Sequence, residues 1–243
     1  MWLNCDLGES YGSWKMPVEE AVMQVIDQAN IACGFHAGDP VTLQQALRLA
    51  VAHQVQIGAH PAYPDLQGFG RRSMQLSESE LIGCIQYQVS ALQGLATLAG
   101  GQLTYVKPHG ALYNDMMKNS VLRGQVFRAV AQFSHPSLAL MIQAHPDHAT
   151  FQAEADALGL SLYFEAFADR RYTDEGWLTP RSQSNAVLNH DEAVAQARQI
   201  IEQGTITTEH GQILTFPVDS LCVHGDSPGA VEMATHIRQL LAR

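Results

Sequence analysis

Acidic, histidine and lysine residues gather at five places in this sequence, each beside a short apolar run. The five strings are NCDLGE (4–9), NIACGFHAGDP (30–40), GAHPAYPD (58–65), KPHG (107–110) and HGDSP (224–228). Each string also contains glycine or proline, which let the backbone approach a ligand closely or stiffen a turn. Carboxylates and imidazoles exchange protons, and ammonium groups stabilise negative charge. The recurring pattern therefore indicates a polar functional rim.

Some of these residues are candidates for catalysis. Asp6, Glu9 or Asp226 would act as general base toward water, with a neighbouring histidine shuttling the proton. Lys107 and His109 would stabilise the negative charge that develops on a substrate oxygen. The six candidates are Asp6, Glu9, His60, Lys107, His109 and Asp226.

A second set of residues is expected to bind the substrate. Arginine suits bidentate capture of a carboxylate or a phosphate, and arginines follow the third and the sixth apolar runs. A surface ion pair, such as Asp169 with Arg170, is the competing explanation for at least one of them. The candidates for substrate binding are Asn4, His36, Arg71, Arg72, Glu165, Arg170 and His224.

Asp6, His36 and His60 could also bind a divalent metal ion, because barrel hydrolases assemble their ligands from separate strands. The sequence contains no H-E-x-x-H metal helix, no P-loop and no G-x-S-x-G serine motif. For any single histidine or aspartate, the competing explanation is a helix cap or a bond to loop amides. A cap explains Asp39, and a helix start with exposed histidines is preferred for the string HPDH (145–148).

The elements that must position these residues are short apolar runs alternating with helical patterns. Expected strands cover 2–6, 28–33, 55–60, 103–107, 138–143, 161–165 and 220–224. Expected helices cover 41–53, 77–99, 120–133, 147–158, 191–203 and 228–240, with a small hairpin at 205–216. This alternation predicts an α/β fold whose parallel strands are joined by right-handed crossovers. Seven strands could close into a barrel or form an open sheet. A barrel is preferred, with its chemistry at the C-terminal ends of the strands.

Composition and charge limit the class of protein. The 243 residues show no linker or low-complexity run, so a single domain over 1–243 is expected. The formal net charge of −10 would repel a phosphate backbone, which argues against nucleic-acid binding. The sequence has no run of 18 apolar residues, so no membrane-spanning helix is expected. The N-terminus lacks the pattern of a signal peptide. Four scattered cysteines fit buried thiols in a reducing compartment, so we expect a cytoplasmic protein.

Several long strings, in order along the chain, resemble those of the LamB/YcsF family. They are NCDLGE (4–9), NIACGFHAGDP (30–40), GAHPAYPDLQGFGRR (58–72), VKPHGALYN (106–114), EAFADRRY (165–172), LTPRSQ (178–183) and CVHGDSPGA (222–230). Two places depart from the family pattern. Residues 184–187 (SNAV) stand where a small Gly-Ala pair is usual, and residues 143–146 (QAHP) stand where the family is Gly-rich.

The resemblance implies a fold similar to the seven-stranded glycoside hydrolase/deacetylase barrel. It also implies that the chain is one component of 5-oxoprolinase, which converts 5-oxo-L-proline to L-glutamate with ATP and two partner subunits, PxpB and PxpC. Because this chain has no P-loop, the partner subunits are expected to supply most of the ATP-binding site. Two alternatives stay open: a stand-alone metal-dependent deacetylase or amidohydrolase, and a non-catalytic subunit that delivers substrate.

Overall fold

The computed structural model describes residues 1–16, 19–223 and 229–242. Within these ranges the strands are β1 (Trp2–Leu7), β2 (Gln28–Ala32), β3 (Gln56–His60), β4 (Leu103–Val106), β5 (Ala139–Gln143), β6 (Leu162–Phe167), β7 (Thr205–Thr207), β8 (Ile213–Thr215) and β9 (Ser220–Cys222). The helices are α1 (Glu19–Met23), α2 (Pro40–Ala52), α3 (Glu78–Leu98), α4 (Gly110–Lys118), α5 (Ser120–Ala131), α6 (His148–Asp156), α7 (His190–Gln203) and α8 (Ala230–Leu241).

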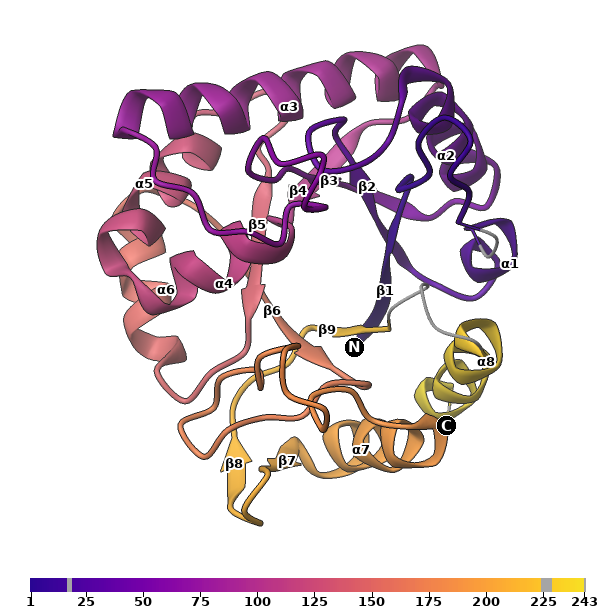
Figure 1. The fold of residues 1–243 in the computed structure, drawn as a ribbon, viewed down its shortest axis with the longest axis vertical. Helices are drawn as coiled ribbons and strands as arrows, with labels where there is room; N and C mark the ends of the chain where they lie inside the picture. Colours follow the sequence, from indigo (N-terminus) through magenta and orange to yellow (C-terminus); the bar gives the residue numbers. More distant parts are fainter. Residues whose placement is uncertain (17–18, 224–228, 243) are drawn as a thin grey trace.

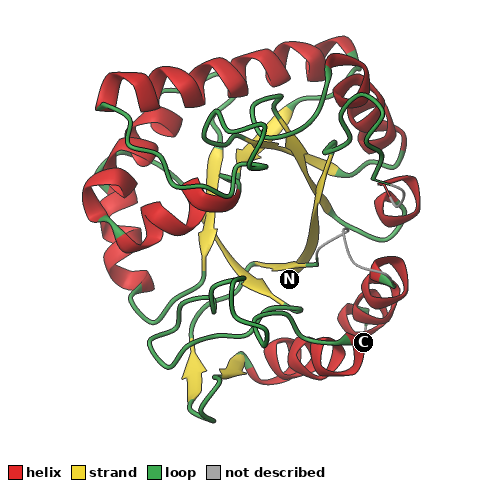
Figure 2. Ribbon diagram, in the orientation of Figure 1, coloured by secondary structure: helices red, strands yellow, loops and turns green. Residues whose placement is uncertain are grey.

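Seven parallel strands form a closed barrel in the order β1-β2-β3-β4-β5-β6-β9. The short strand β9 closes the ring, because Cys222 lies beside Asn4 of β1 on one edge and beside Phe167 of β6 on the other. Figures 1 and 2 show the strands around the centre of the molecule and the helices outside them. The expected α/β barrel is therefore confirmed.

The expected elements agree with the structure to within a few residues, with two exceptions. Helices α1 and α4 were not expected, and α4 begins at Gly110, directly after a string that reads as a loop. The expected hairpin at 205–216 is the antiparallel pair β7–β8. The expected ends of the last strand and of the last helix fall partly on residues 224–228, outside the described residues.

Local sequence signals set where several helices begin. The Asp39 carboxylate accepts hydrogen bonds from the amides of Val41 and Thr42 and caps α2, as expected. Ser77 and Glu80 form the expected capping box at the start of α3. A second capping box, from Asn189 and Glu192, begins α7. These caps satisfy amides of the first helical turn and set where the outer helices begin.

The barrel interior is crossed by a hydrogen-bonded chain of polar side chains. Asn4 Nδ2 donates to Ser220 Oγ at 2.8 Å, and Ser220 Oγ donates to Gln28 Oε1 at 2.7 Å. Asn30 Nδ2 donates to Asn4 Oδ1 at 2.8 Å, and the Tyr105 hydroxyl donates to Asn30 Oδ1 at 2.6 Å. All five residues are fully buried, so these bonds satisfy polar groups that burial would otherwise leave unpaired.

Gly58 makes room for the largest of these side chains. A Cβ at this position would lie 2.2 Å from Cε2 of Tyr105, closer than two carbon atoms can approach. The Tyr105 ring packs with Ala139 and Met141 in a small apolar cluster that is separate from the main core. A larger side chain at position 58 would therefore displace Tyr105 and its bond to Asn30.

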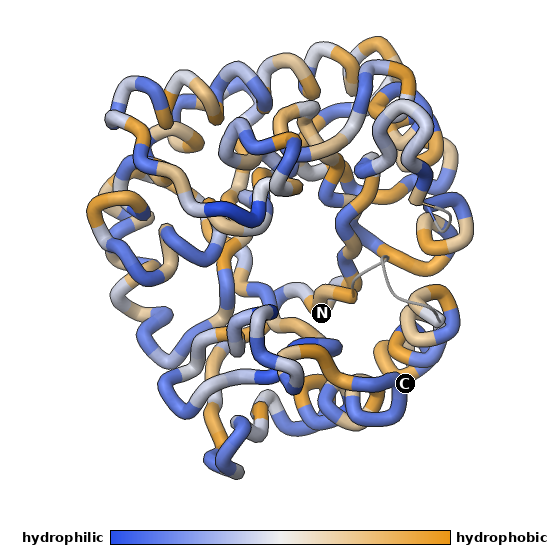
Figure 3. Tube along the Cα trace, in the orientation of Figure 1, coloured by the Kyte–Doolittle hydropathy of each residue, from blue (hydrophilic) through white to orange (hydrophobic). Residues whose placement is uncertain are grey.

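The main apolar core lies between the barrel and its helices. It includes Leu3, Ile31 and Leu140 from strands, which pack with residues such as Leu47 and Val89 from helices. Figure 3 shows hydrophobic and hydrophilic residues mixed along both strands and helices, as expected where one side of a helix faces a core. The four cysteines are free thiols, three of them buried. In the described residues, no helix is long and apolar enough to cross a membrane.

Candidate active site

Lys107, which follows β4, lies at the centre of a buried ionic cluster at the C-terminal end of the barrel. Its Nζ is 2.9 Å from Asp6 Oδ1 and 2.7 Å from Glu165 Oε1. The same nitrogen is 3.3 Å from Asn4 Oδ1 and 3.4 Å from Cys222 Sγ. These residues come from β1, β6, β9 and the position directly after β4, so the closed barrel is what brings them together.

The neighbours of Lys107 favour its charged form. Burial favours the neutral amine, but the negative charges around it, Asp6 foremost, outweigh that effect and hold the pKa of Lys107 well above its ordinary value. Burial also raises the pKa of the neighbouring Cys222 thiol well above its ordinary value, so this sulfur stays protonated. The cluster therefore offers an ammonium group beside carboxylates, and no thiolate nucleophile.

Asp6 links the ionic cluster to a group of histidines. Its Oδ1 accepts hydrogen bonds from Lys107 and from Asn30, and its Oδ2 lies 3.4 Å from His60 Nε2. His60 in turn lies 3.0 Å from His109, measured from Nε2 to Nδ1. Both imidazole rings are buried, His60 at 1% and His109 at 5% exposure.

Backbone carbonyls fix the proton on the far nitrogen of each of these two rings. His60 Nδ1 lies 2.6 Å from the carbonyl oxygen of Lys107, and His109 Nε2 lies 2.9 Å from that of Phe69. A carbonyl only accepts, so both of these nitrogens must donate. Neutral rings would then present two lone pairs to each other across the 3.0 Å contact.

Glu9 and His36 lie beside His109. His36 Nε2 is 3.0 Å from Glu9 Oε1, and this oxygen is 3.5 Å from His109 Nδ1. Burial raises the pKa of Glu9, although His109 opposes the shift. Burial, followed by the neighbouring charge of His60, holds the pKa of His36 well below its ordinary value. Burial and the neighbouring histidines do the same for the pKa of His109.

The loop after β3 supports the histidines through unusual backbone geometry. Phe69 and Gly70 have φ angles of 54° and 63°, in the left-handed region that favours glycine. A Cβ on Gly70 would lie 2.8 Å from both His109 and His36. The Gly70 carbonyl accepts a 2.9 Å hydrogen bond from the amide of Ala111. The first turn of α4 is thus fixed against this loop, with His109 between them.

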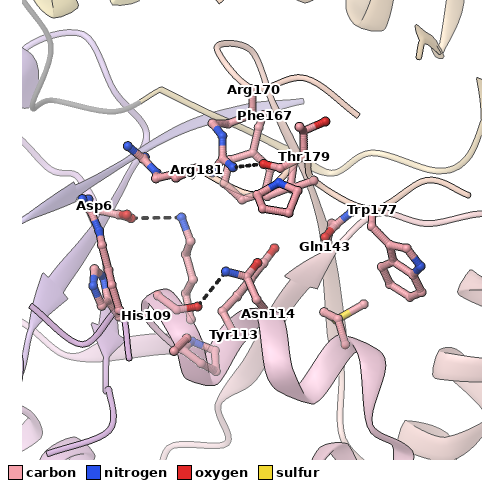
Figure 4. A pocket seen from close by; sticks show the side chains of 18 of the residues that line it. Asp6, His109, Tyr113, Asn114, Gln143, Phe167, Arg170, Trp177, Thr179 and Arg181 are labelled. Atoms are coloured by element: carbon pink, nitrogen blue, oxygen red, sulfur yellow. Dashed lines mark hydrogen bonds and ion pairs between the residues drawn. The ribbon is translucent and has the colours of Figure 1, made fainter. Parts of the chain in front are cut away.

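A pocket of about 380 Å³ opens above these groups. Asp6, Glu9, His60, Lys107 and His109 line one part of it. In Figure 4, Gln143 and Trp177 lie on the side away from Asp6 and His109. The size is typical of a site for a small organic molecule, and the mixture of apolar and charged lining residues would orient it.

The connection between β6 and α7, residues 168–189, forms one wall of the pocket. It contributes residues 177–182 to the lining. Arg170 anchors this connection, because its guanidinium donates to the carbonyl oxygens of Thr179 and Ala186 at 2.7 and 3.3 Å. Burial, with the neighbouring charge of Arg181, lowers the pKa of Arg170 to about 10, which still leaves it charged at neutral pH.

The predicted site residues separate into three groups in the structure. Eight are in contact with the pocket or lie directly beneath its floor at the same end of the barrel. Arg71 also reaches the pocket, above the ring of Phe69, and Arg170 lines it while holding the connection. The eight are Asp6, Glu9, His60, Lys107 and His109, which line the pocket, and Asn4, His36 and Glu165, which are buried behind them.

One predicted residue lies away from the pocket, and two fall outside the described residues. Arg72 points away from the pocket, with its side chain 65% exposed and ion-paired to Asp65. It therefore does not line the pocket. His224 and Asp226 lie outside the described residues. The expectation of exposed histidines at 145–148 is also wrong for His145, which is 3% exposed and stacks on Trp177.

Several pocket residues were missed as site candidates. Tyr113 lies in the unexpected helix α4 and donates a 2.9 Å hydrogen bond to Glu165 Oε2. Gln143 ends β5 and donates to the Gly176 carbonyl at 2.7 Å. Arg181 lines the pocket from the 168–189 connection. The string LTPRSQ (178–183), which carries the family resemblance, was the available signal for Arg181.

The residues that could hold a metal ion differ from the expected set. In the described part of the chain, Glu9, His36, His60 and His109 each place one ligand atom within 4.8 Å of the others. The expected set was Asp6, His36 and His60. Asp6 is not in this group, although its Oδ2 lies 3.4 Å from His60 Nε2.

Comparisons with known proteins agree on one family. The model of the LamB/YcsF family matches residues 1–243. The A subunit of 5-oxoprolinase from Vibrio cholerae is 51% identical over 240 residues, which cover 98% of this chain and 96% of that protein. One of the corresponding 5-oxoprolinase A subunits of Pseudomonas putida is 48% identical over 241 residues, with 98% and 93% covered. The crystal structure of a lactam utilization protein from Thermus thermophilus matches with a TM-score of 0.89 at 37% identity, covering 100% of this chain and 96% of that one.

Proposed function

Because this chain belongs to the LamB/YcsF family, we propose that it is the A component of a 5-oxoprolinase. The reaction would open the five-membered lactam of 5-oxo-L-proline to L-glutamate, with ATP and the partner subunits PxpB and PxpC. The observation that carries the proposal is the pocket in which the Lys107 ammonium and the Asp6 carboxylate lie below a rim containing Arg71 and Arg181. Such a pocket suits a small molecule that has both a carboxylate and an amide.

The arginines at the rim would bind the substrate carboxylate. Arg71 and Arg181 are exposed residues that line the pocket, and a guanidinium group suits bidentate capture of a carboxylate. Their charge would draw an anionic substrate into a chain whose overall charge is −10. A carboxylate held at the rim would leave the lactam ring facing the floor of the pocket.

The groups on the floor would act on the lactam amide. Water adds to the carbonyl carbon, the C–N bond breaks, and the ring nitrogen leaves as an amine after taking a proton. Asp6 would accept the proton of the water, and the Lys107 ammonium would stabilise negative charge on the carbonyl oxygen. Glu9, His60 and His109 line the adjacent wall and would hold the attacking water.

The need for ATP follows from the substrate. A five-membered lactam is unstrained, and its amide carbonyl is a poor electrophile. Transfer of a phosphoryl group from ATP to the amide oxygen, with release of ADP, would make the ring carbon a better electrophile for water. Breaking of the C–N bond would then leave an acyl phosphate, which a second water molecule would hydrolyse to glutamate and phosphate. The chain contains no P-loop, so the partner subunits would supply much of the ATP site. Lys107 and the rim arginines are suited to the charge of a phosphorylated intermediate.

The rival activity is that of a metal-dependent amidohydrolase that needs neither ATP nor partners. The cluster of Glu9, His36, His60 and His109 favours it, since such ligands are typical of metal hydrolases. A non-catalytic delivery subunit would instead need the pocket only for binding.

Reconstitution distinguishes a catalytic 5-oxoprolinase component from a metal-dependent amidohydrolase and from a delivery subunit. The chain is combined with PxpB, PxpC, ATP and 5-oxoproline, and glutamate and ADP are measured. We expect equal amounts of both products, and neither when this chain is omitted. Glutamate formation by the partners alone would leave the chain a delivery role at most. Chelator-sensitive amide hydrolysis by the isolated chain without ATP would instead identify the amidohydrolase. In the same assay, Lys107→Met should remove activity, and Lys15→Met, which changes an exposed lysine outside the pocket, is its matched control.

A further inference from the structure

His60 and His109, which line the pocket, make a contact that is unfavourable between two neutral imidazoles. His60 and His109 each donate their far nitrogen to a backbone carbonyl, at 2.6 and 2.9 Å. The two nitrogens that remain face each other at 3.0 Å, and in neutral rings both carry lone pairs. Such a contact is stable when a positive centre, either a proton or a metal ion, lies between or beside the two atoms.

The surroundings of the pair match those of metal ligands in proteins. Histidines that bind metals donate their other ring nitrogen to a carbonyl or carboxylate, which fixes the tautomer and directs the lone pair at the ion. Both rings are buried and held in place, His60 at 1% and His109 at 5% exposure. Glu9 Oε1 lies 3.5 Å from His109 Nδ1 and completes a group of two imidazoles and one carboxylate. Ligand atoms at about 2.0–2.1 Å from a tetrahedral Zn²⁺ are about 3.3 Å apart, close to these separations.

His36 has a different part in this arrangement. Its ring stacks on that of His109, with centroids 3.8 Å apart and planes 6° from parallel. A metal ion lies near the plane of an imidazole that binds it, so two stacked rings do not share one ion. His36 Nε2 instead lies 3.0 Å from Glu9 Oε1, where it orients the carboxylate. His36 is therefore a positioning residue for Glu9.

We propose that Glu9, His60 and His109 bind one divalent transition-metal ion, with Zn²⁺ the best match to two imidazoles and a carboxylate. Three protein ligands leave a further position open toward the pocket, which all three residues line. An ion held there lowers the pKa of a bound water molecule. This site goes beyond the proposed lactam reaction and does not depend on it.

The test measures metal binding by the isolated full chain, without substrate, ATP or partners. The chain is stripped with a chelator and titrated with Zn²⁺ by calorimetry and with Co²⁺ by visible absorption. We expect one tight site, a tetrahedral Co²⁺ spectrum, and a rise in melting temperature with Zn²⁺. Glu9→Gln and His109→Gln should each weaken binding by more than about 100-fold, since even outer-shell changes cost about 10–100-fold.

A matched control removes a surface pair that could bind metal by accident. His190 Nε2 and His236 Nδ1 lie 3.1 Å apart at an exposed position. His190→Gln should leave the tight site unchanged, and loss of binding in this variant would overturn the proposal. Absence of binding by the wild-type chain at up to about 1 mM Zn²⁺ would also overturn it, and would assign a shared proton to the histidine pair. Because Glu9→Gln is nearly isosteric, loss of the Zn²⁺-dependent rise in melting temperature is informative even if His109→Gln does not fold.

Discussion

Replacement of Lys107 by methionine tests both the stability and the chemistry of the ionic cluster. Met has a similar length and no charge, so Asp6 and Glu165 would lose the ammonium group that lies 2.9 and 2.7 Å from them. Removing one partner of a buried ion pair costs about 3–5 kcal/mol, because the other charge stays buried without compensation. For a chain of this length, that corresponds to a decrease of about 6–20 °C in melting temperature.

The pH of the experiment follows from the shift of the Lys107 pKa. The pKa of Lys107 is raised in the folded protein, above its ordinary value of 10.5. Its contribution to stability is therefore fully present below that value and is lost only as the pH rises through the folded-state pKa. Thermal and denaturant unfolding at pH 7 thus report the whole effect, and Lys15→Met should unfold like the wild type.

Activity and a compensating variant complete the test. In the reconstituted complex, Lys107→Met should lower kcat by at least about 10²–10³-fold, the usual effect of removing one group that stabilises an oxyanion. Adding Glu165→Gln should restore about 1–3 kcal/mol of stability and no activity, since it removes an uncompensated charge but supplies no ammonium group. Unchanged stability in Lys107→Met would refute the energetic argument, and unchanged kcat would refute the catalytic role.

Three further changes test separate parts of the site. Arg71→Met should raise KM for 5-oxoproline about 10–100-fold with a small change in kcat, whereas Arg72→Met should leave both unchanged in steady-state assays. Gly70→Ala should lower stability by about 1–3 kcal/mol in denaturant unfolding, because its φ is 63° and the new Cβ would meet His109; a neutral result would show that the loop adapts. Tyr113→Phe should cost about 1–3 kcal/mol, since Glu165 loses its 2.9 Å hydrogen bond, and an unchanged melting temperature would contradict this.

The sequence was informative where residue type and position along a strand decide the outcome. Polar residues at the ends of parallel strands must meet at one end of a barrel, and Asp6, His60 and Lys107 are in mutual contact there. The caps of α2 and α3 were recognisable because a single side chain bonds to amides two or three residues away. Such effects depend on few residues and on local geometry.

Other features depend on backbone geometry or on distant contacts. Arg71 and Arg72 are adjacent in sequence, but they follow two residues with positive φ, and one reaches the pocket while the other pairs with Asp65. In β1, Asn4 and Asp6 alternate with apolar residues. This pattern indicates a polar face directed into the barrel only when the barrel is known to be closed. Helix α4 begins with Gly110, which has low helix propensity, and its start is fixed by the Gly70 carbonyl.

The hydrogen bond from Asn4 to Ser220 joins residues 216 positions apart. Asn4 also contacts Lys107, so the floor beneath the reactive groups depends on the final strand of the barrel. On a ribosome, β1 would emerge long before its closing neighbour β9, and the pocket could not assemble until β9 had been made. Until then the nascent chain would stay inactive, and the unpaired edges of β1 and β6 would be the places where it could pair wrongly with other chains.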